Sequence, residues 1–237
     1  MKTSLRVAGW GTLGFALTFF VTFTINAVIN MTTVSPDYPT AAQMAADFGS
    51  GVLFVLTWSS AGIALGVAAH GLSAVVWPDG GLVARISAGF GVIATTGWLL
   101  SGVTVLAQRT ALLNGNITGA GADAAAERAV VELGFIGVHI GGILFSVALV
   151  PWLVIVAVGA ARSRRIPVTA IVFLWVAAIA PLAGFVTTGF QYGVLVVMLS
   201  FAVVGPVLLR HAARSARADV VARELEATRA ATPTAAG

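Results

Sequence analysis

The stretch that decides the fold is VELGFIGVHIGGILFSVALVPWLVIVAVGA, from Val131 to Ala160. A helix needs about 20 predominantly apolar residues to cross a bilayer, and this run is longer than that. Glu132 stands at its start, and a cluster of arginines follows its end from Arg162 onward. Because a backbone in lipid must satisfy its own hydrogen bonds, the run is predicted to be a transmembrane helix.

The composition of the whole chain favours a membrane protein. Of its 237 residues 58% are hydrophobic and 9% are charged, whereas soluble domains carry about 25% charged residues. The chain has no cysteine, which excludes disulfides, thiolate metal sites and a cysteine nucleophile. Arginine far exceeds lysine, and alanine, valine and glycine dominate, a usage typical of GC-rich bacteria. We therefore expect a multi-pass protein of the bacterial inner membrane.

Six stretches of the chain are long and apolar enough to span a bilayer. The predicted fold is all-α, an integral membrane bundle of six transmembrane helices over residues 1–209, followed by a basic helical tail and a disordered end over residues 210–237. The predicted spans are about Val7–Ile29, Phe48–Val76, Val83–Ala107, Val131–Ala160, Pro167–Thr187 and Gln191–Leu209.

The distribution of basic residues predicts the orientation. With the N-terminus in the cytoplasm, all lysines and arginines except Arg109 and Arg128 fall on the inner side. Cytoplasmic loops carry this excess in membrane proteins, so we expect both termini in the cytoplasm. The charges lie between and after the apolar runs, which favours contact with membrane lipids and argues against a nucleic-acid partner. In the tail, Arg210, Arg214 and Arg217 are predicted to share a helix face that meets anionic headgroups.

Two glycine pairs spaced by four residues indicate close helix contacts. They are Gly62 with Gly66, and Gly137 with Gly141. Either pair fits a homo-oligomer contact, and either fits packing within one chain, which the sequence favours.

The polar residues within or near the spans gather in their outer halves. Polar groups are costly in lipid and normally turn inward, so an outward-facing polar vestibule is predicted. Its candidate ligand-binding residues are Asn26, Thr104, Glu132, His139 and Gln191. The alternative is that these residues simply meet water and headgroups at the membrane surface.

The sequence predicts no cofactor, no metal site and no catalytic set. His70 and His139 lie on helices that run in the same direction, but their depths differ by roughly 20 Å at 1.5 Å per residue, too far to ligate one haem iron. Phosphate loops, zinc-binding HExxH helices and serine elbows are absent from the sequence.

Three functional classes remain. The leading one is a protein that binds or passes a small or lipophilic ligand through the vestibule. The second is a membrane-embedded enzyme acting on a lipid or isoprenoid, with Glu132 and His139 as acid and base. The third is a structural subunit of a membrane complex.

Two short motifs carry a family resemblance. Arg6-Val-Ala-Gly opens the first span, and Arg162-Ser, followed by Ile166-Pro, forms an inner turn. With these motifs, most of residues 5–188 resembles a bacterial family of uncharacterised polytopic membrane proteins, of the domain-of-unknown-function 4386 type. The resemblance implies a helical membrane protein and implies no activity.

Overall fold

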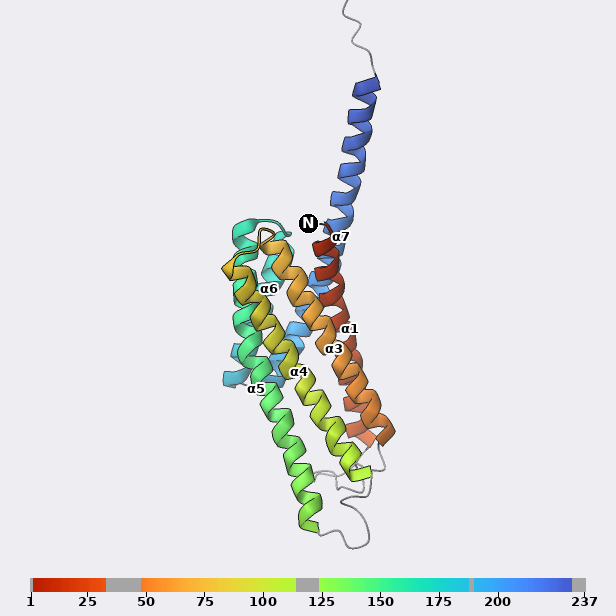
Figure 1. The fold of residues 1–237 in the computed structure, drawn as a ribbon, viewed down its shortest axis with the longest axis vertical. Coiled ribbons are helices and arrows are strands. Elements are labelled where there is room, and N and C mark those ends of the chain that lie inside the picture. The colour runs from red at the N-terminus through yellow and green to blue at the C-terminus, as the bar shows by residue number, and fades with distance from the viewer. Residues whose placement is uncertain (1, 33–47, 114–123, 188–189, 232–237) are drawn as a thin grey trace, which may run out of the picture.

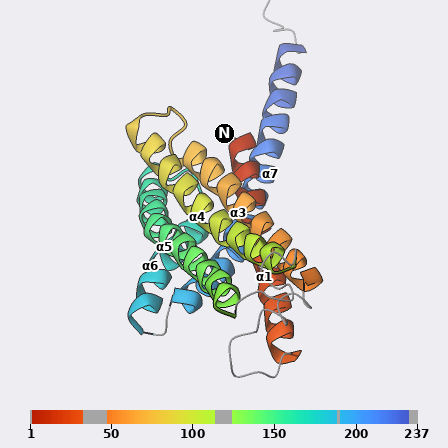
Figure 2. The ribbon, with the colours of Figure 1, turned by 60° about the horizontal axis from the view of Figure 1, so that its bottom comes forward.

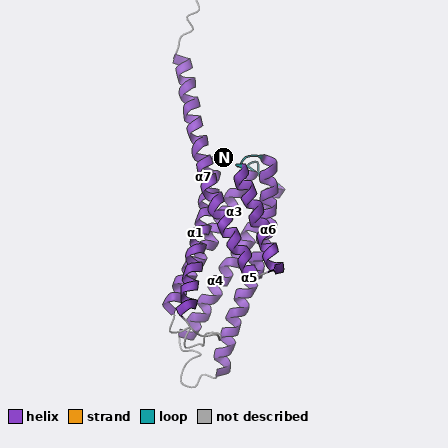
Figure 3. Cartoon of the chain, turned by 180° about the vertical axis from the view of Figure 1, so that it is seen from behind, coloured by secondary structure: helices purple, strands orange, loops and turns teal. Residues whose placement is uncertain are grey.

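The computed structural model describes residues 2–32, 48–113, 124–187 and 190–231, and these residues form six helices and no strand (Figure 3). This confirms the predicted all-helical fold. Five helices are long and apolar enough to cross a membrane, while the described apolar part of the sixth, Val168–Ala183, is shorter. The helices are α1 (Lys2–Thr32), α3 (Phe48–Val76), α4 (Leu82–Leu113), α5 (Ala124–Ser163), α6 (Val168–Thr187) and α7 (Phe190–Ala231).

The six helices close into a ring. Each helix packs against the next one in the chain, and α7 returns to pack against α1 (Figures 1 and 2). Because successive helices are joined by connections at alternate ends, neighbours in the ring run antiparallel. The bounds of α3 match the predicted span, whereas α5 starts before the predicted Val131 because the alanine-rich segment in front of it joins the same helix.

Buried aromatic side chains occupy the centre of this ring. Phe15 of α1 meets both Trp98 of α4 and Phe201 of α7, with 5.7 Å between ring centroids in each pair. Trp98 also packs edge-on against Phe145 of α5 at 4.8 Å. Since α1 and α4 are not neighbours in the ring, these side chains meet inside it and join helices that do not otherwise pack together.

A reciprocal pair of tryptophans joins α3 to α4. The indole rings of Trp58 and Trp98 stack with centroids 4.2 Å apart and an interplanar angle of 12°. The Nε1 group of each ring donates a hydrogen bond of 2.8 Å to the backbone carbonyl oxygen of the other residue. A buried indole N–H normally needs an acceptor, and this arrangement supplies one to both rings at once.

The two glycine pairs lie at contacts inside the chain. A Cβ atom on Gly141 would stand 2.6 Å from the carbonyl oxygen of Gly97, so α4 and α5 approach too closely there for any side chain. A Cβ atom on Gly62 would stand 2.9 Å from the Trp98 ring, and one on Gly66 would stand 3.3 Å from Thr95. Both glycine faces therefore pack against α4, and a dimer formed through them would have to displace it.

One end of the bundle carries most of the basic residues and is called the basic end below. The N-terminus lies there, and α7 continues past it as an unbroken helix that extends away from the ring (Figure 1). An ion pair between Lys2 and Asp219 joins the first turn of α1 to this extension. The predicted tail helix is therefore a continuation of the last helix. Because the extension projects away from the ring, it carries Arg217 farther from the bundle than Arg210 or Arg214.

Candidate functional site

Two polar residues of α4, Thr104 and Gln108, lie in the far half of the bundle, opposite the basic end, and both pack against α5. Gln108 is buried, and its Nε2 donates a 3.0 Å hydrogen bond to the carbonyl oxygen of Val131. The Thr104 hydroxyl donates to the carbonyl oxygen of Leu100 in its own helix, and its side chain covers Gly137. Thr104 thus contributes to helix packing, and its hydroxyl is already paired.

Glu132 and His139 lie on the opposite side of α5, where both side chains are exposed. His139 Nδ1 is 2.7 Å from the carbonyl oxygen of Phe135, one turn earlier. Gly137, which packs against Thr104, is two residues from His139, and two residues turn a helix by about 200°. The structure therefore has Glu132 and His139 on one exposed face of α5, and that face is directed away from Thr104.

Of the five predicted site residues, the three whose side chains the structure describes do not lie together in one enclosed vestibule. Thr104 lies inside the α4–α5 contact, while Glu132 and His139 face outward. The side chains of Asn26 and Gln191 fall outside the described residues. Ligand binding by this set remains a prediction.

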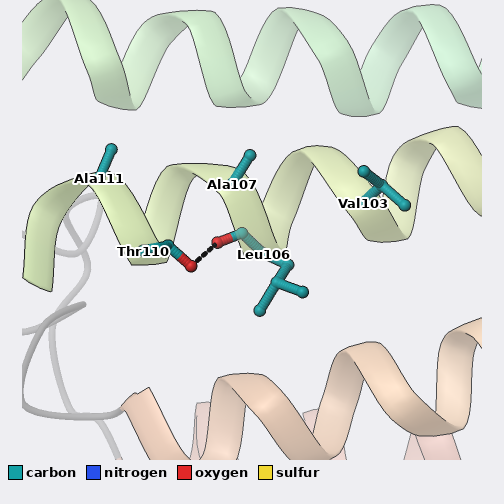
Figure 4. Close-up of a pocket in the computed structure, with 5 residues that line it drawn as sticks. All are labelled: Val103, Leu106, Ala107, Thr110 and Ala111. Carbon is teal, nitrogen blue, oxygen red and sulfur yellow. Dashed lines mark hydrogen bonds between the residues drawn. The ribbon is translucent and has the colours of Figure 1, made fainter.

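A different hollow lies on α4, at the far end of the bundle. This far-end groove has a volume of about 490 Å³ and is open to the outside. Thr110 is its one polar side chain, and the Thr110 hydroxyl donates a 2.8 Å hydrogen bond to the carbonyl oxygen of Leu106 (Figure 4). The groove is lined by Val103, Leu106, Ala107, Thr110 and Ala111.

Sequence reasoning missed this groove because its lining looks like ordinary lipid-facing surface. Ala107 and Ala111, four residues apart, point to one side of α4, and Leu106 points to the other (Figure 4). Small residues at i and i+4 among larger ones leave a depression on a helix surface. That spacing was the available signal, but it is equally typical of helix packing.

No protein-family model matches the chain, and neither a curated protein nor a solved structure matches it. The family resemblance therefore stays a prediction. The helical ring, the lengths of its apolar helices and the basic end define the class of the protein, a multi-pass membrane protein.

Proposed function

We propose that this chain is a six-span protein of the bacterial inner membrane that binds a lipophilic ligand in the far-end groove, on the outer side. The observation that supports the proposal is the groove itself. Its volume of about 490 Å³ falls within the roughly 300–1,000 Å³ of small-molecule sites, which are mostly apolar. The proposed site is at the end of the bundle opposite the basic end, and its lining is apolar, unlike the polar vestibule that the sequence predicts.

Binding is a better description than passage through the ring. The aromatic side chains of Phe15, Trp98 and Phe201 pack against one another across its middle. Close packing of this kind leaves no room for a solute, since protein interiors are as dense as organic crystals. A ligand would therefore reach the groove laterally from the bilayer.

The proposed orientation places the basic end in the cytoplasm. It follows from the positive-inside rule, because every lysine and arginine except Arg109 and Arg128 belongs to that end. A reporter enzyme fused after Gly237 should be active only in its cytoplasmic form. Activity of a periplasm-dependent reporter at the same position would contradict this orientation.

Photolabelling tests the ligand proposal. A fatty acid carrying a diazirine group should label residues 103–111 of α4 more strongly than the lipid-facing surfaces of other helices. Ala107→Phe should fill the groove and remove this labelling. Ala202→Phe, at an exposed position on α7, is the matched control and should leave the labelling unchanged. Equal labelling of all exposed helices, or labelling that survives in Ala107→Phe, would refute the proposal.

A structural subunit is the second candidate, supported by the exposed outer part of α5. There, large apolar side chains such as Leu133 and Ile136 are 64% and 54% exposed. The enzyme alternative has weaker support, because Glu132 and His139 lie on an open surface, away from the groove residues.

A further inference from the structure

One fully buried polar group of the bundle lacks a hydrogen-bond partner among the described residues. It is the indole N–H of Trp152 on α5, a side chain that is 0% exposed. Trp58 and Trp98 show the usual arrangement, since each donates from Nε1 to a backbone carbonyl oxygen at 2.8 Å. A buried indole N–H normally has such an acceptor. The Trp152 group is therefore an exception that needs an explanation.

The depth of Trp152 in the bundle makes this exception costly. Trp152 lies about 16 Å from Ser163, the last residue of α5, at 1.5 Å per residue. The hydrocarbon core of a bilayer is about 30 Å thick, so Trp152 is far from the water at either surface. Bulk water cannot supply the acceptor at this depth, and an unpaired donor is expensive there.

Thr95 on α4 is a second exception of the same kind. Its hydroxyl oxygen is buried and has no partner among the described residues. A threonine in a helix commonly donates to the carbonyl oxygen four residues earlier. Thr18 and Thr22 of α1 do so, both at 2.7 Å. The Thr95 hydroxyl thus points to something other than its own helix.

The two unpartnered atoms lie on adjacent turns of the contact between α3 and α4. A Cβ atom on Gly91 of α4 would stand 3.7 Å from Trp152 Nε1, and it would also meet Ala69 of α3. Thr95 is one turn further along α4, and its hydroxyl oxygen is 3.3 Å from the Cβ position of Gly66 on α3. Glycine on both helices therefore lets the two polar atoms reach the same contact.

The chemistry of these two groups fits a water molecule. An indole N–H can only donate, whereas a threonine hydroxyl can also accept. Side chains four residues apart on a helix are about 5–6 Å apart. Two hydrogen bonds of about 2.8–2.9 Å through one oxygen cover a similar distance.

We propose that the contact of α3, α4 and α5 holds a bound water molecule that accepts a hydrogen bond from Trp152 Nε1 and donates one to Thr95 Oγ1. Buried waters in proteins typically pair polar groups that are otherwise unsatisfied. Water is the ligand that fits, because Trp152 is fully buried and its ring packs edge-on against Phe201, with 6.2 Å between centroids. The site does not depend on ligand binding in the far-end groove.

Nuclear magnetic resonance of the full chain, labelled with nitrogen-15 at its tryptophans, tests the site. Trp152→Phe identifies the Trp152 signal as the one that disappears. In the wild type, the Nε1 proton of Trp152 should show a cross-peak to long-lived water. Trp98 is the matched control and should show none, because it is 3% exposed and already donates to a carbonyl oxygen. Absence of the cross-peak at Trp152 would overturn the proposal, and an upfield signal would then indicate that the N–H points at the Phe201 ring.

Removal of the second partner tests the bridge. Thr95→Val replaces the hydroxyl by a methyl group of similar size, so most of the water cross-peak of Trp152 should be lost. Thr96→Val changes the next residue, which is exposed, and should leave the cross-peak unchanged. Unaltered Nε1 signals of Trp58 and Trp98 would show that the contact of α3 with α4 is intact in both variants. Thr95→Ser keeps the hydroxyl and should keep the cross-peak. A cross-peak of full strength in Thr95→Val, or its loss in Thr95→Ser, would overturn the bridge.

Discussion

The stacked tryptophans give the sharpest test of how the ring is held together. We consider Trp98→Phe, which removes an indole that is 3% exposed. The change loses the 2.8 Å hydrogen bond from Trp98 Nε1 to the carbonyl oxygen of Trp58, worth about 1 kcal/mol. The missing part of the indole leaves a cavity of roughly 40 Å³, which at about 24 cal/mol per Å³ costs about 1 kcal/mol.

Two further considerations complete the expected loss in the free energy of unfolding for Trp98→Phe. Weaker ring stacking on Trp58 removes about 0.5 kcal/mol. Loss of apolar surface from Trp98 adds no hydrophobic contribution, because the lipid around separated helices is as apolar as the core. The free energy of unfolding should therefore fall by about 2–3 kcal/mol.

Denaturation in detergent micelles, followed by circular dichroism, measures this loss. Trp10→Phe is the matched control, because Trp10 is 63% exposed on α1 and its replacement should change the free energy of unfolding by less than about 0.5 kcal/mol. If Trp98→Phe and Trp10→Phe lose the same amount, the reciprocal pair does not stabilise the ring, and the reasoning is refuted.

Two other changes test the positions of residues in α4 and α5. His139→Leu, measured on the detergent-solubilised protein, should leave the free energy of unfolding within about 0.5 kcal/mol of the wild type because His139 bonds only within its own helix among the described contacts; a loss of 1–3 kcal/mol would instead place it in a polar interior. Gly141→Ala should destabilise by about 1–3 kcal/mol through overpacking against Gly97. Its control Gly89→Ala, where a Cβ atom meets nothing within 4 Å, should be neutral or stabilise by up to about 1 kcal/mol; equal effects at the two glycines would contradict the close α4–α5 contact.

The helices could be predicted from the sequence because the bilayer sets the length of an apolar run. This is why the predicted bounds of Phe48–Val76 agree with α3. The continuation of α7 past Leu209 could not be separated from a loop followed by a second helix, since both give the same helical pattern. The roles of Trp58 and Trp98 were not predicted either. Their pairing depends on which turn of α3 faces which turn of α4, and no spacing within one helix encodes that register.

The direction of each helix face was the hardest feature to predict, and α5 shows why. In a soluble protein the apolar face of a helix points to the core. In a membrane protein lipid and core are equally apolar, so the apolar pattern does not show which face of the helix is buried. The rule that polar residues turn inward predicted that Glu132 and His139 face the interior. The structure instead turns the small residues Gly134, Gly137 and Gly141 inward, because close backbone contact with α4 gives more packing than an imidazole could. The polar residues Glu132 and His139 are left on the opposite, exposed side of α5.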